Sequence, residues 1–146
     1  MSALHLSSIP PHTSCAQLHG GANTAGSPFR VVCYNMLADI YANRQIYPYC
    51  PAWALAWNYR RNNILRELTS YEADLMCLQE VQGDHFENFF QPRLNALGFE
   101  GVFKPKTRDA LGDNPNAIDG CAIFFRRDRF SLTEQYSIEV CTVGVM

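Results

Sequence analysis

The alternation of apolar and polar positions along this chain predicts a mixed α/β fold. One stretch, Asn58 to Tyr71, has helical periodicity. The helix face expected to be buried carries Arg61, Ile64, Leu65, Leu68 and Tyr71, and the opposite face carries Arg60, Asn62, Arg66 and Glu67. Strands are expected at Phe29 to Tyr34, Ala73 to Val81, Phe99 to Phe103, Asp119 to Arg127 and Thr133 to Val140. The opening order of strand, helix and strand indicates a crossover unit or a helix lying on the outside of a sheet.

A second helix is predicted to begin at Asp84. Glu87 follows three residues later, which is the spacing of a capping box. Pro92 is expected to kink or interrupt this helix, and Gly98 is expected to end it. Its buried stripe is expected to hold Phe86, Phe89, Phe90, Leu94 and Leu97. Two further segments are irregular: Asp39 to Ala56 is expected to be an ordered excursion packed on the body, and Lys104 to Asn116 a polar loop.

Composition bounds the class of protein. The chain has 146 residues, 47% of them hydrophobic and 18% charged, which fits a globular domain or part of a larger one. The formal net charge of -2 excludes a strongly basic, histone-like nucleic-acid binder, although a local basic groove is compatible with it. Residues 1–27 contain no charged side chain and few large apolar ones, so they are expected to be a flexible tail, with the folded domain in residues 28–146.

The cysteines and histidines favour an intracellular protein without a zinc site. The six cysteines form no C-x-x-C pair, and Cys33, Cys77 and Cys121 lie inside apolar, strand-like runs where a free thiol packs as a small hydrophobe. We therefore expect reduced thiols. No apolar run approaches the roughly 18 residues that cross a bilayer, so no membrane association is expected.

Candidate chemistry lies at two strand ends. Glu80 follows the apolar run LMCL, and a carboxylate held at such a position suits Mg²⁺, which is bound by one or two carboxylates, waters and substrate phosphates. Asn35 ends the first strand and could converge on the same point, where its amide would orient a carboxylate, the water shell of the metal or a phosphate oxygen. The simpler alternatives are that Glu80 only caps a strand end and that Asn35 caps its own turn.

Three segments together resemble one known family. YNMLAD (Tyr34 to Asp39), LQEVQ (Leu78 to Gln82) and DGCAIFFR (Asp119 to Arg126) are similar to motifs of the endonuclease/exonuclease/phosphatase superfamily. With YCPAWALAWNYRR (Tyr49 to Arg61), the likeness is to the carbon catabolite repressor type deadenylases of the Ccr-Not complex. This resemblance implies an α/β (α+β) fold in which two packed β-sheets form a sandwich flanked by helices. It also implies Mg²⁺ dependence, with two ions in the complete domain, and 3′ to 5′ removal of adenylates from poly(A) RNA in the cytoplasm or also the nucleus.

Matched residue by residue, the resemblance makes Glu80 the metal-binding glutamate and Asn35 the active-site asparagine. Asp119, Gly120 and Asp39 lie in family motifs, but we expect structural roles for them, with Asp119 bonding locally and Gly120 permitting a close backbone approach. Lys104, Lys106 and Arg108 could steer phosphates, although a solvated loop is the simpler interpretation. Aromatic residues that could stack bases, yet are more often packing, are Tyr41, Tyr47, Trp53 and Trp57.

The chain also departs from the family pattern. A later Asp-x-Asn motif and a closing Asp-His pair, which the resemblance implies for the catalytic centre, have no counterpart before Met146. We therefore expect the N-terminal half of a domain that carries part of an active site. Three functions stay open: a poly(A)-specific exoribonuclease with Ccr-Not subunits as partners, an inactive fragment that binds RNA or a partner, and a phosphodiesterase of the same fold acting on a small molecule.

Overall fold

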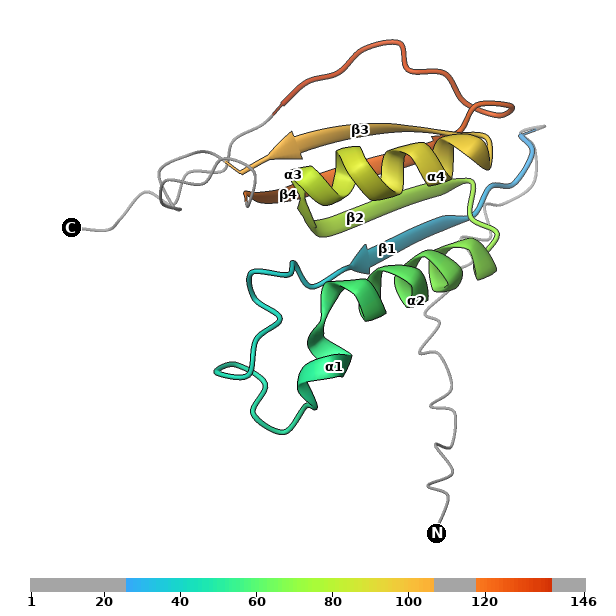
Figure 1. The fold of residues 1–146 in the computed structure, drawn as a ribbon. Helices are drawn as coiled ribbons and strands as arrows, with labels where there is room; N and C mark the ends of the chain where they lie inside the picture. Colours follow the sequence, from blue (N-terminus) through green and yellow to red (C-terminus); the bar gives the residue numbers. More distant parts are fainter. Residues whose placement is uncertain (1–25, 107–117, 138–146) are drawn as a thin grey trace, which may run out of the picture.

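A computed structural model describes residues 26–106 and 118–137 of this chain. These residues form a four-stranded sheet with helices packed against it (Figure 1). In chain order the elements are β1 (Val31–Asn35), α1 (Ala52–Leu55), α2 (Trp57–Ser70), β2 (Leu75–Gln82), α3 (Gly83–His85), the π-helical turn η1 (Phe86–Phe90), α4 (Gln91–Ala96), β3 (Phe99–Pro105) and β4 (Asp119–Arg126). The expected mixed α/β fold is confirmed, and the described strands supply a single sheet of the expected sandwich.

The strands lie in the order β1-β2-β4-β3. β1 and β2 are parallel, with Val31 opposite Leu75 and Asn35 opposite Gln79. Parallel neighbours need a crossover, and α1 and α2 supply it, as the strand, helix, strand order predicted. β4 is antiparallel to both β2 and β3. This topology brings the carboxyl ends of β1 and β2 to the same edge of the sheet.

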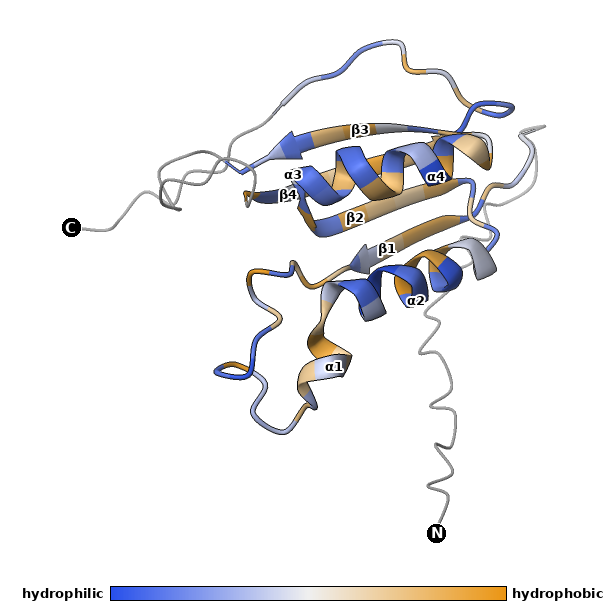
Figure 2. Cartoon of the chain, viewed as in Figure 1, coloured by the Kyte–Doolittle hydropathy of each residue, from blue (hydrophilic) through white to orange (hydrophobic). Residues whose placement is uncertain are grey.

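The core lies between one face of the sheet and the helices. Alternate residues of the two central strands point into it, with Met76 and Leu78 from β2 and Ala122 and Phe124 from β4. The helices contribute fully or nearly fully buried side chains to the same cluster: Ile64, Leu68, Phe86, Phe89, Phe90 and Leu94. Figure 2 shows the matching concentration of apolar residues along the central strands, against mixed helices. The expected helix over Asn58 to Tyr71 is therefore confirmed, with α2 beginning one residue earlier.

The opposite face of the sheet is open among the described residues. It carries Val31, Cys33, Cys121 and Ile123, of which Val31 is 44% and Ile123 42% exposed. Cys77 lies opposite both Cys33 and Ile123 on this face and is half-buried. The alternation along β1 and β4 therefore predicts a surface that needs a covering layer.

The second predicted helix differs from the sequence expectation. Its residues fold as α3, η1 and α4 in direct succession, and Pro92 lies in the first turn of α4 rather than inside a continuous helix. The π-helical turn just before Pro92 is the local response to a residue that lacks an N–H and crowds the preceding turn. The capping box is wrong, since no side chain caps this start and Asp84 instead accepts the N–H of His85. Leu97 is also wrong as a core residue, because it follows the end of α4 and is 56% exposed.

The strand expected at Thr133 to Val140 is wrong for its first five residues. Residues 133–137 carry no strand and are exposed, and residues 138–140 lie outside the described part. β1 and β3 are the edges of this sheet, and neither pairs with a further described segment. An alternating pattern gives only a weak preference for a strand, and tertiary packing decides whether the strand forms.

The helices of the described residues include none that is both long and apolar enough to cross a membrane.

A buried acid ties the beginning and end of the described sheet together. The carboxylate of Asp74 accepts the backbone N–H of Arg30 at 2.8 Å and lies 2.7 Å from the guanidinium of Arg129. Arg129 also donates to the carbonyl of Pro28 at 2.7 Å. Burial by itself would raise the pKa of Asp74, but the Arg30 N–H and the Arg129 charge outweigh it and lower the pKa below its ordinary value of 3.8.

Replacing Asp74 by asparagine should lower the free energy of unfolding at pH 7 by about 2 kcal/mol, because Arg129 then loses its charged partner. Since the folded pKa is depressed, the carboxylate stabilises the fold above pH 3.8 and loses that contribution as the pH falls through the lowered value. The gap between wild type and variant should therefore narrow below pH 3.8. Urea unfolding at low protein concentration measures it, with the exposed pair of Asp128 as control, since Asp128→Asn should leave the midpoint unchanged. A gap independent of pH would contradict this assignment.

Candidate active site

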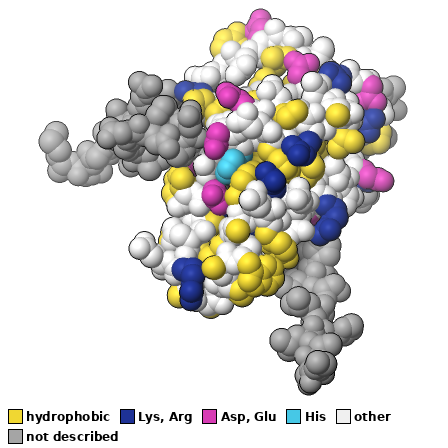
Figure 3. All heavy atoms as spheres, viewed as in Figure 1, with side chains coloured by type: hydrophobic (Ala, Val, Ile, Leu, Met, Phe, Trp, Pro, Cys, Tyr) yellow, Lys and Arg dark blue, Asp and Glu magenta, His cyan; other side chains and the backbone are white. Residues whose placement is uncertain are grey.

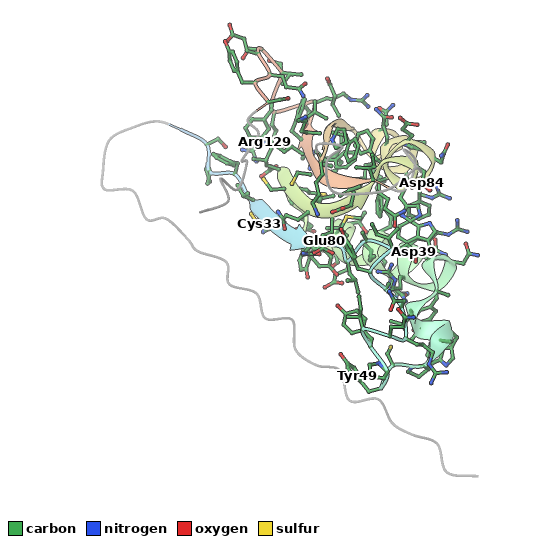
Figure 4. The ribbon with its side chains drawn as sticks, turned by 90° about the vertical axis from the view of Figure 1, so that its left-hand side faces the viewer. Cys33, Asp39, Tyr49, Glu80, Asp84 and Arg129 are labelled. Atoms are coloured by element: carbon green, nitrogen blue, oxygen red, sulfur yellow. The ribbon has the colours of Figure 1, made fainter. Side chains whose placement is uncertain are left out.

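Asn35 and Glu80 lie together at the carboxyl ends of β1 and β2, as the strand order predicted. The Asn35 side-chain amide donates to Glu80 Oε1 at 2.7 Å. The pairing of β2 with β4 shifts register between Leu78 and Val81, and this irregularity includes Glu80. Bulges of this kind re-aim a side chain at the rim of a sheet. In Figure 4 the labelled Glu80 lies between Cys33 of β1 and Asp39 of the following segment.

The backbone after Asn35 closes around this pair. Asn35 Oδ1 accepts the N–H of Leu37 at 2.9 Å, and Glu80 Oε2 accepts the N–H of Ala38 at 3.3 Å. The Asn35 amide therefore has its oxygen on a donor and its nitrogen on an acceptor, which fixes its orientation. Asn35 caps its own turn and also contacts the carboxylate, so the two interpretations raised by the sequence are both present in the geometry.

Two residues of this site have strained backbone conformations. Glu80 has φ of 55° and Leu37 has φ of 54°. A left-handed conformation in a non-glycine residue costs about 1–3 kcal/mol, and such residues are retained where surrounding contacts hold them, often at functional sites. Both strained residues belong to the same network, because Leu37 is bonded to Asn35 and Asn35 to Glu80. Backbone strain in two residues of one hydrogen-bonded network favours a functional role for this edge of the sheet.

The donor set fits a magnesium ion in part. Glu80 is half-buried, and each of its oxygens accepts one hydrogen bond, which leaves lone pairs for a cation. Within residues 26–106 and 118–137, no group of three acidic, cysteine or histidine side chains could hold a metal by itself. A single carboxylate is nevertheless compatible with Mg²⁺, which keeps several waters and takes ligands from substrate phosphates. Glu80 can thus supply one protein ligand, with Asn35 orienting it.

Asp119 is a fully buried acid with distant partners. Its Oδ1 accepts the hydroxyl of Tyr41 at 3.1 Å, and its Oδ2 lies 2.6 Å from Lys106 Nζ, an ion pair by distance. The expectation that Asp119 bonds locally is wrong, since Tyr41 lies 78 residues away in sequence. The structural role fits, because these bonds fasten the excursion after β1 to the ends of β3 and β4. The close approach expected at Gly120 is also present, where an added Cβ would lie 2.2 Å from the Lys104 carbonyl oxygen.

The three basic residues proposed to steer phosphates have different surroundings. Lys106 is paired with Asp119, and this contact, more than any other, raises the pKa of Lys106. Lys106 follows the end of β3 and its side chain is 50% exposed, which fits the expected solvated loop, although its charge is partly compensated by Asp119. Lys104 lies on β3 and is half-buried. Arg108 lies outside the described residues.

The aromatic residues of the excursion mostly pack. Trp57 stacks on His85 with ring centroids 3.7 Å apart and also contacts the edges of Phe89 and Phe90. Burial lowers the pKa of His85, against the opposing effect of the Asp84 and Asp39 charges. Figure 3 shows acidic and basic side chains interspersed with hydrophobic ones on the face in view. Trp53 is exposed and meets Tyr59 edge-on. The packing interpretation is confirmed for Trp57, which contacts His85, Phe89 and Phe90.

Sequence reasoning missed Arg60, which it placed on the solvent face of α2. The Arg60 side chain is only 12% exposed, and its guanidinium lies 3.3 Å from the carboxylate of Asp39. Glu67, placed on the same face, is half-buried and accepts the hydroxyls of Tyr34 and Tyr71 at 2.8 and 2.7 Å. Asp39, which we expected to be structural, also borders a hollow of about 300 Å³ lined by Asn43, Arg44, Leu55 and Trp57. Periodicity does not reveal the contacts of Arg60, because its partners come from residues 36–55, most of which form no regular element.

Comparison with known proteins agrees with this geometry. Residues 23–145 match the Endonuclease/Exonuclease/phosphatase family. The chain is 59% identical over 111 residues to Carbon catabolite repressor protein 4 homolog 1 of Arabidopsis thaliana, covering 76% of this chain and 18% of that relative. It is 45% identical over 113 residues to the CCR4-Not complex 3'-5'-exoribonuclease subunit Ccr4 of Mycosarcoma maydis, covering 76% of this chain and 17% of the relative.

A solved structure of similar fold is that of ANGEL2, a 2',3'-cyclic phosphatase, in complex with adenosine-2',3'-vanadate. The match has a TM-score of 0.64 and 39% sequence identity, and it covers 73% of this chain and 29% of that one. The chain therefore spans less than a fifth of the length of the two curated relatives, at 18% and 17%.

Proposed function

Because this chain belongs to the Endonuclease/Exonuclease/phosphatase family, we propose that it supplies one part of the catalytic centre of a Mg²⁺-dependent 3′ to 5′ exoribonuclease that acts on poly(A) RNA. The observation that carries the proposal is the bonded pair of Asn35 and Glu80, held in strained backbone at the carboxyl ends of two parallel strands. The similarity to a relative named as a CCR4-Not complex 3'-5'-exoribonuclease subunit supports an RNA substrate, the 3′ to 5′ direction and CCR4-Not subunits as partners. Poly(A) as the RNA and the cytoplasm or nucleus as the location are part of the proposal.

In this proposal each residue has a defined task. Glu80 presents an anionic oxygen to the cation, and Asn35 and the N–H of Ala38 hold that carboxylate in one orientation. Bound Mg²⁺ would polarise the phosphorus centre, help to generate hydroxide and stabilise the leaving oxygen. The Asn35 amide also has the donors needed to contact a phosphate oxygen. In the pattern that the resemblance implies, the groups that place the attacking water belong to motifs later than those of Asn35 and Glu80.

A second candidate is a phosphodiesterase acting on a small or terminal phosphate. The observation that favours it is the structural match to ANGEL2, a 2',3'-cyclic phosphatase. The Asn35 and Glu80 pair fits both reactions, because each needs a cation and a polar group at a phosphoryl centre. The two candidates differ in the substrate end, which is a free 3′-hydroxyl in one and a 2',3'-cyclic phosphate in the other.

The test uses a completed domain, defined as the Arabidopsis homolog 1 with its matched 111-residue segment replaced by that of this chain. Labelled oligo(A) and oligo(C) with free 3′ ends, and oligo(A) ending in a 2',3'-cyclic phosphate, are incubated with and without Mg²⁺. Stepwise shortening of oligo(A) alone, and only with Mg²⁺, is the expected result. Equal shortening of oligo(C) would contradict poly(A) specificity, and opening of the cyclic end without shortening would establish the second candidate.

Replacing Asn35 by alanine should reduce the turnover of the completed domain by about a hundredfold or more, the scale for loss of a positioned polar group. Asn35 is exposed, so the thermal midpoint should change little. Steady-state kinetics with oligo(A) and a thermal melt measure the two effects, with the exposed Asn62→Ala of α2 as control. A collapse of stability with normal activity in the folded fraction would show that Asn35 only caps its turn.

A further inference from the structure

Arg60 makes an unusually complete set of contacts with the segment that follows Asn35. Its guanidinium donates to the carbonyl of Leu37 at 2.6 Å and to that of Met36 at 3.2 Å. The same group donates to the carbonyl of Leu55 at 2.9 Å and pairs with the Asp39 carboxylate at 3.3 Å. Arginine has five donors in a rigid fork, so one side chain can hold several backbone acceptors in fixed directions, whereas lysine has three donors on a single nitrogen at the end of a flexible stem.

The segment held by Arg60 is the one that contacts the candidate catalytic pair. Its N–H groups point to the opposite side: that of Leu37 to Asn35, that of Ala38 to Glu80, and that of Ile40 to the buried side chain of Gln82. Residues 36–40 therefore form a strap with the carbonyl oxygens of Met36 and Leu37 on Arg60 and with N–H groups on the site.

The strain at Leu37 shows why the strap needs an anchor. Its φ of 54° is a conformation that a leucine leaves unless its surroundings hold it. The shortest bond of Arg60, at 2.6 Å, goes to the carbonyl of this same residue. The Leu37 N–H is bonded to Asn35, so relaxation at Leu37 would move the donor that orients the amide.

We propose that Arg60 is a positioning residue, which fixes the orientation of Asn35 and Glu80 through the strap of residues 36–40. The inference rests on the proposed function of those two residues. Arg60 itself contacts neither of them in any described bond, and it acts by holding the carbonyl side of the strap. A purely structural role would instead join α1 and α2 to the body through Leu55 and Asp39, and its loss would lower stability without altering the site.

The kinetic test compares Arg60→Ala and Arg60→Lys in the completed domain, with Arg66→Ala on the exposed side of α2 as the matched control. Arg66 bonds only Asn63 among the described contacts. In the folded fraction, Arg60→Ala should lower kcat for oligo(A) by about ten- to a hundredfold, the cost of a misplaced catalytic group, with KM changed less than twofold. Arg60→Lys, which retains one donor to the Leu37 carbonyl, should recover part of the loss, and Arg66→Ala should match wild type.

A second readout does not depend on activity. Hydrogen exchange of the peptide spanning residues 36–40 should become more than about tenfold faster in Arg60→Ala, while the peptide spanning residues 75–79 keeps its protection. Unchanged exchange in the strap, or equal acceleration in both peptides, would overturn the proposal. Should Arg60→Ala not fold, Arg60→Lys carries the test, with a smaller but selective acceleration expected in the strap.

The proposed function of the site and the positioning role of Arg60 can be disproved separately. If Glu80→Gln keeps wild-type turnover, the proposed function of the site is wrong, and selective exchange in the strap would still support Arg60 as its anchor. If Glu80→Gln is inactive while Arg60→Ala keeps wild-type kcat, the positioning role alone is overturned.

Discussion

Replacing Glu80 by glutamine should abolish turnover of oligo(A) in the completed domain, by about a thousandfold or more, while leaving the fold intact. The change keeps the size of the side chain and removes the anionic charge that would hold Mg²⁺. It also removes one of two acceptors, because Glu80 receives both the Asn35 amide and the Ala38 N–H. One of these donors must lose its partner, so orientation fails together with charge.

Single-turnover cleavage across a Mg²⁺ titration measures this effect, with circular dichroism to verify the fold. Glu72→Gln is the matched control, since the Glu72 side chain is 81% exposed and, within the described part of the chain, pairs only with Arg30. Near wild-type cleavage by Glu80→Gln at every Mg²⁺ concentration, with an unchanged Mg²⁺ requirement, would remove Glu80 from the set of metal ligands. A raised Mg²⁺ requirement with a full maximal rate would assign it to binding of the ion alone.

The parts of this site that sequence predicts are those that strands deliver. A short apolar run such as LMCL is typical of a buried strand in a mixed fold. β2 ends at Gln82, which places Glu80 near the edge of the sheet. β1 is also an apolar strand and ends at Asn35. The helical crossover between β1 and β2 allows the two strands to lie parallel. Convergence of the two side chains then follows from topology.

Contacts with irregular backbone could not be predicted in this way. The charge of Arg60 suggests a solvent face, although Ile64, four residues later on the same helix face, is buried. The acceptors of Arg60 are the carbonyls of Met36, Leu37 and Leu55, which no side-chain pattern encodes. Leu37 adopts a conformation that its residue type disfavours, so only the assembled tertiary contacts explain it. The π-helical turn before Pro92 is similar, because the proline predicts a disturbance without saying which form it takes.

The chain expressed by itself should associate and should not trim poly(A). Alternate residues of β1 and β4 leave an apolar sheet face uncovered among the described residues, with Val31 at 44% and Ile123 at 42% exposure beside Cys33 and Cys121. The edge strands β1 and β3 also offer unpaired backbone groups to another chain. A face of this kind is stable only against a second layer, and in a two-sheet sandwich that layer is the other sheet. Catalysis should be absent, since Glu80 and Asn35 alone hold Mg²⁺ weakly.

Sedimentation velocity of the 146-residue chain, binding of a dye to apolar surface and Mg²⁺-dependent cleavage of oligo(A) test this expectation together. Ile123→Lys places a charge in the centre of the open face and should shift the chain towards monomer and reduce dye binding. Leu132→Lys is the matched control, because Leu132 is 46% exposed but lies outside the sheet, and it should leave association unchanged. A monodisperse monomer that melts cooperatively and shortens oligo(A) would show that the face is covered and that the site is complete within this chain.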